Sequence, residues 1–460
     1  MTTGFAPADA ASRPLHLVDD DGLAGFLDAV TPDQRTWLVA IGFKATLGQL
    51  VLLPGEGGAP SGAVFGLGSA AARIRGRFHV AKAVADLPDG TWHLDGPSAA
   101  FTPDETALGW LLASYRFTRY KTATAPKARL KAPHGVDVKR IEAIAASEAL
   151  TRELINTPAS DMGPDEIEAA VRAVAADFGA QIAVTQGDDL LPGFPMIHAV
   201  GRASPRAPRL IDLTWGATGP RLTLVGKGVC FDTGGLDLKP ASSMGLMKKD
   251  MGGAATALGL ARSIMALGLP LRLRLLIPAV ENSVAGNAFR PQDILTSRKG
   301  LTVEINNTDA EGRLILADAL TLADEGAPDL IVSMATLTGA ARTAVGPDLA
   351  PFYCDDDRVA AILSAAGSRV ADPLWRMPFW DPYESMIEPG IADLDNAPSG
   401  GMAGSVTAAL FLRRFVTATP AYVHFDIYGW QPVAAPARPK GGVGQGARAV
   451  LDALPALMGF

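Results

Sequence analysis

Cysteine is scarce in this 460-residue sequence, which holds only Cys230 and Cys354. Two cysteines are too few for a disulfide framework in a chain of this length, and they form no CxxC pair that could hold zinc. Residues 1–7 also lack the basic start and the long apolar stretch of a secretory signal. We therefore expect a protein of the reducing cytoplasm.

An excess of positive charge is absent as well. The chain has 41 Lys and Arg residues against 48 Asp and Glu residues, which gives a net charge of −7. This balance argues against a protein whose main ligand is a phosphate backbone, so it disfavours a nucleic-acid partner without excluding one. The basic residues between positions 119 and 131 are interpreted as part of a solvated connector.

Long hydrophobic runs and histidines are also few. The most apolar windows, residues 271–280 and 330–341, are far shorter than the roughly 20 residues that cross a bilayer, so we expect no membrane association. The sequence has six histidines. Of these, His198 and His424 have apolar neighbours and are predicted to be packed core residues rather than metal ligands.

What the sequence does contain is a large apolar fraction, 48%, with 49 glycines and 34 prolines. This composition predicts a globular α/β protein of two domains. Residues 1–130 are expected to form the smaller α/β domain, with a linker at about 119–136, and residues 137–460 the larger domain. Within the first domain, residues 36–54 are predicted to form a strand, a turn and a second strand.

In the larger domain, short apolar runs alternate with segments of helical periodicity. Strands are expected at residues 222–225, 271–276, 330–334 and 422–427, and helices at 137–157, 163–178, 253–267, 314–323, 405–415 and 448–457. This alternation predicts a mostly parallel central sheet flanked by helices. Ligand sites in such sheets lie beyond the carboxyl ends of the strands.

The first segment with candidate functional residues runs from Val225-Gly-Lys-Gly to Lys248-Lys-Asp-Met-Gly-Gly. Its Gly226-Lys-Gly does not fit the GxxxxGK[ST] phosphate loop, because Leu222 and Gly228 stand where glycine and a hydroxyl residue are required. The remaining charged residues are separated by glycines that would let them converge: Lys227, Asp232, Lys239 and Asp250. Taken alone, they fit equally well a solvated flexible loop.

The second segment, Asn306-Asn-Thr-Asp-Ala-Glu-Gly-Arg, favours a functional site over a solvated loop. Asp309 and Glu311 are expected to lie on one side of an extended stretch just before a helix. Four carboxylates gathered at the ends of strands would repel one another without a cation among them. Two divalent metals are the simplest such cations, and an oxygen-rich set suits Mg, Mn or a carboxylate-bridged Zn pair.

The stretch Asn307-Thr-Asp-Ala-Glu-Gly-Arg-Leu314 resembles the signature octapeptide of the cytosol (leucyl) aminopeptidase family, peptidase family M17. Residues 225–253 resemble the other metal-binding stretch of that family, with matching spacing between the charged residues. Further similarity lies in Leu154-Ile-Asn-Thr-Pro-Ala, Thr336-Leu-Thr-Gly-Ala, Ala392-Asp-Leu-Asp-Asn and His424-Phe-Asp-Ile. The resemblance covers roughly residues 137–460, and it implies a metal-dependent exopeptidase that hydrolyses the N-terminal peptide bond of peptides.

The resemblance also implies roles for individual residues. One metal, Mn²⁺ or Zn²⁺, would be held by Lys227, Asp232, Asp250 and Glu311, and a more exchangeable one by Asp232, Asp309 and Glu311. As a ligand, Lys227 would be neutral. Lys239 would stay charged and stabilise the oxyanion, and Arg313 would hold a bicarbonate that acts as general base. The first substrate side chain would lie near Met247, Thr336 and Gly339, with the Leu337 carbonyl near the substrate amino group.

Family members form hexamers, so the resemblance implies a homohexamer. Departures from the family pattern at Lys248-Lys-Asp, Ala341-Arg-Thr-Ala and residues 440–447 leave the preferred first residue open. One alternative is another two-metal hydrolase, such as a phosphatase or amidase, but only Lys239 would be left to face a phosphate. The other is a non-catalytic or moonlighting role in DNA binding or as a scaffold, which the net negative charge disfavours.

Overall fold

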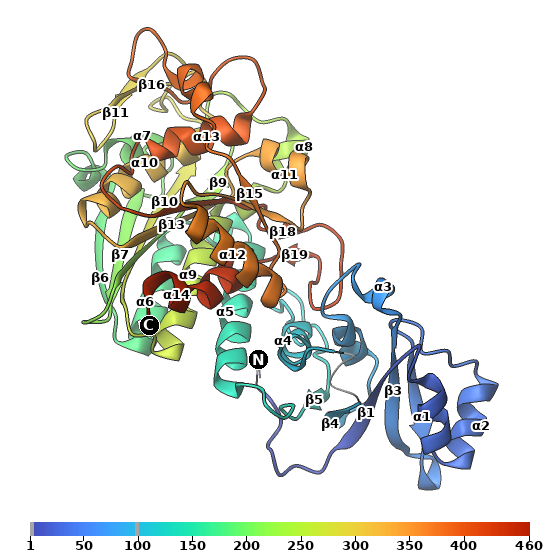
Figure 1. Cartoon of the computed structure of the whole chain (residues 1–460). Coiled ribbons are helices and arrows are strands. Elements are labelled where there is room, and N and C mark those ends of the chain that lie inside the picture. The colour runs from blue at the N-terminus through green and yellow to red at the C-terminus, as the bar shows by residue number, and fades with distance from the viewer. Residues whose placement is uncertain (1–3, 97–100) are drawn as a thin grey trace. The chain divides into compact units, whose positions relative to one another are not determined.

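In the computed structural model, which describes residues 4–96 and 101–460, the chain forms two compact units (Figure 1). The first unit comprises Met1–Ala149 and Val433–Lys440, and the second comprises Leu150–Pro432 and Gly441–Phe460. A short segment near the C-terminus therefore returns to the first unit before the chain ends in the second.

The described part of the first unit contains a five-stranded sheet in the order β2-β3-β1-β4-β5. Its strands pair in parallel, except that β2 pairs with β3 in the antiparallel direction. The strands are β1 (Arg13–Asp19), β2 (Leu50–Pro54), β3 (Pro60–Gly68), β4 (Gly90–Asp95) and β5 (Ala128–Leu130). The helices are α1 (Leu23–Ala29), α2 (Pro32–Ala40), α3 (Ala70–Arg73) and α4 (Pro103–Ala113), with the 3-10 helices η1 (Glu56–Gly58) and η2 (His79–Ala85).

The predicted strand at the start of residues 36–54 is wrong, because residues 32–40 form helix α2. A capping box explains the helix: Thr31 accepts the backbone N–H of Gln34, and the Gln34 side chain accepts the backbone N–H of Thr31. Pro32 stands in the first turn, where its fixed φ favours a helix. Strand β5 lies within the residues that the sequence predicts as a linker.

The described part of the second unit is built on a nine-stranded sheet whose main path is β15-β14-β17-β13-β8-β10-β7-β6, with β9 paired to β10. The strands at its centre, β17, β13, β8 and β10, are all parallel to one another. The nine strands are β6 (Gln181–Gln186), β7 (Arg209–Trp215), β8 (Arg221–Gly226), β9 (Gly228–Asp232), β10 (Arg272–Asn282), β13 (Leu330–Ala335), β14 (Ala350–Tyr353), β15 (Leu374–Met377) and β17 (Tyr422–Asp426).

Helices cover both faces of this sheet (Figure 1). Helices α7 (Pro195–Gly201), α10 (Glu311–Glu325) and α13 (Gly404–Arg413) pack together on one face. The other face carries α6 (Pro164–Phe178), α9 (Gly252–Leu267), α12 (Asp357–Arg369) and α14 (Ala447–Met458). The predicted fold class, a two-domain α/β protein with a mostly parallel central sheet flanked by helices, is confirmed.

Shorter elements complete the second unit. They are α8 (Ala241–Met244), α11 (Gly339–Val345), the 3-10 helices η4 (Ala159–Asp161), η5 (Gly187–Leu190), η6 (Met247–Met251) and η7 (Asp381–Ile387), and the strands β11 (Ile294–Thr296), β12 (Thr302–Glu304), β16 (Leu394–Asp395), β18 (Trp430–Gln431) and β19 (Gly441–Gly442). Helix α5 (Val138–Asn156) begins in the first unit and ends in the second.

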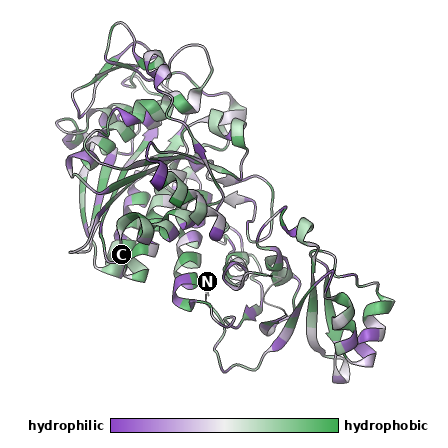
Figure 2. Cartoon of the chain, viewed as in Figure 1, coloured by the Kyte–Doolittle hydropathy of each residue, from purple (hydrophilic) through white to green (hydrophobic). Residues whose placement is uncertain are grey.

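The core of the second unit is apolar on both sides of the central sheet (Figure 2). Nearly all side chains of β8, β10 and β13 are buried, as expected for strands covered by helices on both faces. Among the described residues, no helix combines the length and the apolar character needed to cross a bilayer.

Candidate functional site

Polar residues follow the carboxyl ends of neighbouring parallel strands. Lys227 follows β8, Asp232 ends β9, Asn282 ends β10, Thr336 follows β13 and Asp426 ends β17. Because these strands are parallel, the residues lie at one edge of the sheet. The site is therefore where the alternation of strands and helices predicts it.

Lys227 lies at the break between β8 and β9 and is 3% exposed. Its backbone N–H donates to the Met334 carbonyl, which anchors the break to β13. Its Nζ lies 2.7 Å from Asp250 Oδ2 and 3.0 Å from Glu311 Oε1. The lysine thus joins the two sequence segments that carry the predicted ligands.

Gly312 makes room for this lysine. A Cβ at position 312 would lie 2.5 Å from Cε of Lys227 and 2.6 Å from its Nζ. Any larger residue would displace the lysine from Glu311. The glycine within the Asp309-Ala-Glu-Gly-Arg run is therefore a packing requirement of the site.

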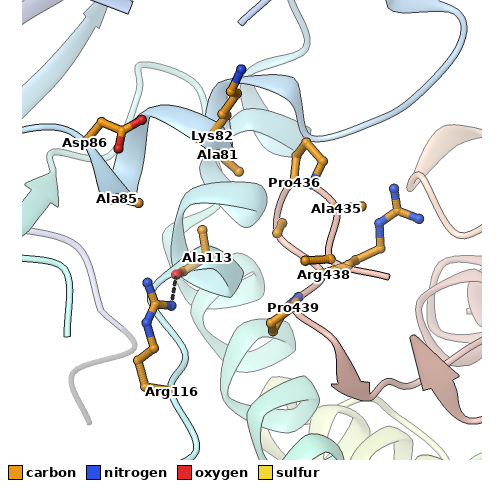
Figure 3. A pocket seen from close by; sticks show the side chains of 12 residues that line it. Ala81, Lys82, Ala85, Asp86, Ala113, Arg116, Ala435, Pro436, Arg438 and Pro439 are labelled. Carbon is orange, nitrogen blue, oxygen red and sulfur yellow. Dashed lines mark hydrogen bonds between the residues drawn. The ribbon is translucent and has the colours of Figure 1, made fainter. Parts of the chain in front are cut away.

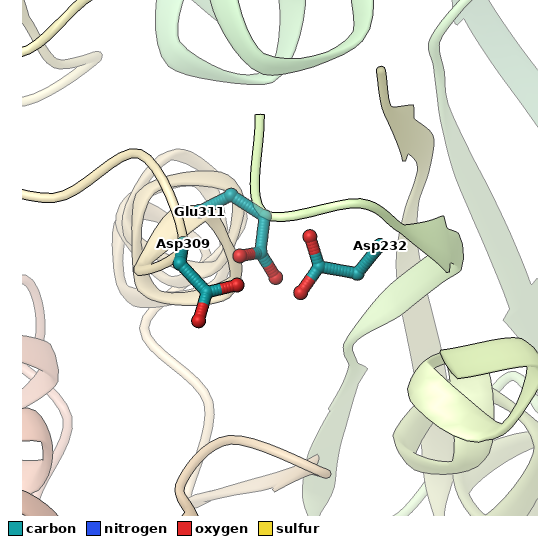
Figure 4. Close-up of side chains that lie close together, drawn as sticks. All are labelled: Asp232, Asp309 and Glu311. Atoms are coloured by element: carbon teal, nitrogen blue, oxygen red, sulfur yellow. The ribbon is translucent and has the colours of Figure 1, made fainter. Parts of the chain in front are cut away.

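Asp232, Asp309 and Glu311 form a carboxylate cluster in which one oxygen from each lies within 4.8 Å of the others (Figure 4). The expected extended stretch is wrong: Asp309 lies in a turn, and Glu311 is the first residue of α10. The turn and the helix start, rather than strand alternation, bring the two carboxylates together. An acidic residue at the N-terminus of a helix is also favoured by the helix dipole.

Lys239 contacts the same cluster. Its Nζ lies 2.8 Å from Asp232 Oδ2 and also pairs with Asp309 Oδ1. Its side chain is 12% exposed, compared with 3% for that of Lys227. Lys239 is therefore the more accessible of the two cations.

A hydrogen-bond network joins the segment after β9 to the turn before α10. The sequence did not predict this network. The Thr308 backbone N–H donates to Asp237 Oδ2, and the Asp237 backbone N–H donates to Thr308 Oγ1. Asn282 Nδ2 donates to Asp232 Oδ1 at 2.9 Å and to the Thr308 carbonyl at 3.1 Å. Asn282 lies far from both segments in sequence, and only its position at the end of a buried apolar strand could have suggested it.

The carboxylates of the site change one another's pKa values. Burial raises the pKa of Glu311 to about 8, and the negative charge of Asp232 adds to this effect. Burial and Asp232 likewise raise the pKa of Asp309 to about 6. Burial acts to lower the pKa of Lys227, but Asp250, Glu311 and Asp232 outweigh it, so that its pKa is raised.

The donor set fits divalent metal ions. Both oxygens of Glu311 are buried, and apart from the ion pair of Oε1 with Lys227 Nζ they have no hydrogen-bond partner among the described residues. Buried polar atoms in native proteins are otherwise nearly always hydrogen-bonded. Carboxylate oxygens in this number suit Mn²⁺ or a bridged Zn²⁺ pair, and a metal would supply the partner that Glu311 lacks.

Arg313 lies in the first turn of α10 and is buried. Its Nη1 donates to the Asn396 carbonyl, whereas its buried Nε has no hydrogen-bond partner among the described residues. Burial lowers the pKa of Arg313 to about 10, so the guanidinium remains charged at neutral pH. Asn396 in turn accepts the backbone N–H groups of Asn306 and Asn307.

Four residues are predicted to contact the substrate, Leu337 at its amino group and the other three at its first side chain, and they lie in η6 or follow β13. Met247 is buried in η6, and Thr336 Oγ1 donates to Asp250 Oδ1 at 2.9 Å. The Leu337 backbone N–H donates to Asp426 Oδ1 at 3.1 Å, and Gly339 begins α11. The structure thus brings all four residues to the edge of the sheet that carries the predicted ligands.

Lys249 is a buried cation in the same region, and the sequence marks it only as a departure from the family pattern. It is 2% exposed, and its Nζ lies 5.3 Å from the centroid of the Tyr428 ring. Burial lowers the pKa of Lys249 to about 8.

His198 and His424 lie outside the carboxylate cluster. His424 is fully buried in β17, where its Nδ1 lies 2.8 Å from Ser333 Oγ, and burial lowers its pKa to about 3. His198 in α7 pairs with Asp188. His424 is the packed core residue that the sequence predicts, whereas His198 is only partly buried and forms an ion pair at the surface.

The first unit has a pocket of its own, with a volume of about 520 Å³ (Figure 3). It is lined by η2, the end of α4 and the segment Val433–Lys440, and Arg116 donates to the Ala113 carbonyl beside it. None of the predicted site residues lines this pocket.

Comparison with known proteins gives the same result for both parts of the chain. Residues 149–451 match the family model described as "Cytosol aminopeptidase family, catalytic domain", and residues 13–133 match "M17 aminopeptidase, N-terminal domain". A probable cytosol aminopeptidase of Leifsonia xyli subsp. xyli is 36% identical, over 97% of this chain and 95% of that protein. One of Roseiflexus castenholzii is 41% identical, over 77% of each.

Solved structures agree with this result. The crystal structure of cytosol aminopeptidase from Coxiella burnetii is 41% identical and covers 100% of both chains, with a TM-score of 0.94. The bottromycin maturation enzyme BotP in complex with Mn is 32% identical and covers 98% of this chain and 100% of its own, with a TM-score of 0.87. Two matching domain models and near-complete coverage confirm the predicted family. The chain therefore belongs to the cytosol aminopeptidase family, and it is a metal-dependent aminopeptidase, a hydrolase that acts on peptides.

Proposed function

We propose that the chain removes single N-terminal residues from peptides as leucyl aminopeptidases do, with two divalent metal ions at the carboxylate cluster. The observation that carries the proposal is the buried Glu311 carboxyl group. It lies close to Asp232 and Asp309, and among the described residues only Lys227 offers it a positive charge by an ion pair. Such a cluster is stable only with cations, and its two lysines alone leave Glu311 incompletely compensated.

The ligand sets follow the family pattern. Lys227, Asp232, Asp250 and Glu311 would hold one ion, and Asp232, Asp309 and Glu311 the other. The two ions would polarise the scissile carbonyl and activate the attacking water. The Mn complex of BotP supports Mn²⁺ as one of the metals, and Zn²⁺ suits the same ligands.

The remaining roles belong to residues of the chain itself. Lys239 carries its charge at the accessible side of the cluster and stabilises the negative charge that develops on the carbonyl oxygen. Arg313 offers a planar guanidinium beside Glu311, which suits a bicarbonate ion acting as general base. The Leu337 carbonyl accepts a hydrogen bond from the substrate amino group.

We also propose that the active form is a cytoplasmic homohexamer, on the resemblance to the family and on the name of its relatives, cytosol aminopeptidase. Light scattering coupled to gel filtration measures the mass directly. A protein that is active as a monomer would contradict the hexamer without affecting the proposed reaction.

The function is tested by metal analysis of the purified protein, combined with amino-acid release from a panel of aminoacyl amides. We expect two metals per chain and release that depends on them. Full activity in exhaustively demetallated protein would contradict the proposal. Net negative charge and family membership leave a DNA-binding or scaffold role without support.

A further inference from the structure

Lys249 is a buried cation that the proposed mechanism does not use. The described residues offer its ammonium group no carboxylate within 4.0 Å and no hydrogen-bond acceptor, and its contact is with the face of the Tyr428 ring at 5.3 Å. A cation–π contact compensates only part of the cost of burying an ammonium ion. The environment of Lys249 is therefore incomplete without an anion.

Asp250 and Asp426 act on Lys249 through their negative charge, but neither forms an ion pair with it, and each is engaged by other groups. Asp250 pairs with Lys227 and accepts the hydroxyl of Thr336. Asp426 accepts both the backbone N–H and the hydroxyl of Thr338, the backbone N–H of Leu337 and the hydroxyl of Ser405.

A second cation lies against the same aromatic ring. The guanidinium of Arg342 in α11 lies 5.2 Å from the centroid of the Tyr428 ring. Its Nη2 would be 3.5 Å from a Cβ placed on Gly339. Arg342 is exposed, and in the described part of the chain no carboxylate or hydrogen-bond acceptor engages its guanidinium. Two cations thus share one ring, and neither forms an ion pair with a carboxylate of the described residues.

These cations adjoin the region proposed for the first substrate side chain. Lys249 lies in sequence between Met247 and Asp250, and Arg342 lies against Gly339. The Thr336 methyl group is 3.0 Å from the Cβ position of Gly429, the residue after Tyr428. The ammonium group of Lys249 and the guanidinium of Arg342 therefore meet at the Tyr428 ring, and Lys249 directly precedes the proposed metal ligand Asp250 in the sequence.

We propose that this region selects peptides whose N-terminal residue has a carboxylate side chain, glutamate or aspartate, with Lys249 and Arg342 as its specificity-determining residues. A substrate carboxylate supplies the ion-pair partner that the described residues do not provide, and it forms charge-assisted hydrogen bonds with both cations. A site with unpaired buried polar groups rejects an uncharged analogue strongly, because binding that analogue leaves those groups unpaired. This inference rests on the proposed aminopeptidase function.

The test compares coumarin amides of glutamate, glutamine and leucine, because glutamine has the shape of glutamate without its charge and an amide substrate has no other carboxylate. We expect kcat/KM for glutamate to exceed that for glutamine by about 10- to 100-fold, the range of a charge-assisted hydrogen bond. Lys249→Met should lower kcat/KM for the glutamate substrate by a similar factor and should raise, not lower, kcat/KM for the glutamine and leucine substrates, because no unpaired ammonium group then opposes their binding. Arg342→Met should act in the same direction, and Lys249→Arg should keep the preference.

Lys248→Met is the matched control, because Lys248 is the adjacent lysine and its Nζ already donates to the Asn156 carbonyl at 2.6 Å. Its glutamate-to-glutamine ratio should equal that of the unmodified protein. Equal rates on glutamate and glutamine in the unmodified protein, or an unchanged ratio in Lys249→Met, would overturn this inference. Hydrolysis of the leucine amide in that same experiment would leave the proposed function standing, whereas no hydrolysis of any amide in the metal-loaded protein would overturn both.

Inhibition by the free amino acids gives a readout independent of turnover rates. L-glutamate should compete with substrate more strongly than L-glutamine in the unmodified protein, and Lys249→Met should remove the difference. Equal inhibition by the two amino acids in the unmodified protein would contradict the inference.

Discussion

Lys227 and Lys239 pair with different carboxylates of the proposed metal site. Lys227 Nζ lies 2.7 Å from Asp250 Oδ2, whereas Lys239 Nζ lies 2.8 Å from Asp232 Oδ2 and also contacts Asp309. The deeper position of Lys227 suits a ligand inside the metal shell, and the more accessible position of Lys239 suits contact with substrate. Two lysines that composition treats as equivalent therefore have separate proposed roles.

The first prediction separates these roles by substitution with alanine. Lys227→Ala should weaken metal binding, and high metal concentration should restore part of the activity. Lys239→Ala should keep nearly normal metal content while kcat falls by roughly 10²- to 10³-fold, the usual loss for one oxyanion donor. Metal analysis and kcat, measured on the same preparations, provide the test.

Lys239→Arg is the control, because it keeps the charge and changes the reach and geometry of the donor. It should recover only part of the rate. Loss of metal from Lys239→Ala, or a normal kcat in that variant with metal bound, would contradict the division of roles.

The second prediction concerns the two proposed ligand sets. Asp250 contacts Lys227 but lies outside the cluster of Asp232, Asp309 and Glu311. Asp250→Ala should therefore empty mainly the tighter metal position, and Asp309→Ala mainly the exchangeable one. Metal stoichiometry after dialysis against graded metal concentrations distinguishes them. If each variant lost both metals equally, the assignment would be wrong.

The third prediction is that an N-acetylated peptide resists cleavage while its free-amine parent is cleaved. The proposed site binds the substrate amino group in a defined place near the Leu337 carbonyl, and acetylation adds bulk there and removes the free amine. Mass spectrometry of the two peptides after incubation with metal-loaded protein measures the difference. Comparable turnover of both would indicate an endopeptidase or an amidase.

Much of the site was predictable because its residues have distinctive spacing. The strands β8, β10, β13 and β17 are short apolar runs, so their carboxyl ends could be located and Lys227 and Asp232 placed at one edge of the sheet. The turn at Asp309 was not predictable from alternation, because a turn before a helix and an extended stretch contain the same kinds of residue. The predicted local conformation was wrong, yet three of the four predicted carboxylates, Asp232, Asp309 and Glu311, do lie together.

Other features depend on contacts between residues far apart in sequence. Asn282 reaches Asp232 only once β9 and β10 are paired, and no local pattern reports that pairing. The unpartnered state of Lys249 depends on how Asp250 and Asp426 are engaged by other segments. In the first domain, the capping box at Thr31 outweighed the apolar residues that predicted a strand.

The last prediction concerns stability and pH at a position away from the proposed site. Asp324 in α10 accepts the backbone N–H groups of Thr417, Ala418 and Thr419, and the hydroxyl of Thr419 at 2.7 Å. Burial acts to raise the pKa of Asp324, but these hydrogen bonds outweigh it, and its pKa is lowered from 3.8. The carboxylate form is thus bound more tightly in the folded state than in the unfolded chain. The stabilisation by this carboxylate is fully present above pH 3.8, and it is lost as the pH falls through the lower pKa of the folded state.

Asp324→Asn should therefore reduce the free energy of unfolding at pH 7 by about 1–3 kcal/mol, because an amide nitrogen cannot accept these hydrogen bonds. The gap in Tm between the variant and the unmodified protein should narrow once the pH falls below 3.8. Asp189→Asn, at an exposed position, is the control and should leave Tm unchanged across the series. A gap for Asp324→Asn that stays constant from neutral to acidic pH would show that the carboxylate charge is not the source of the stabilisation.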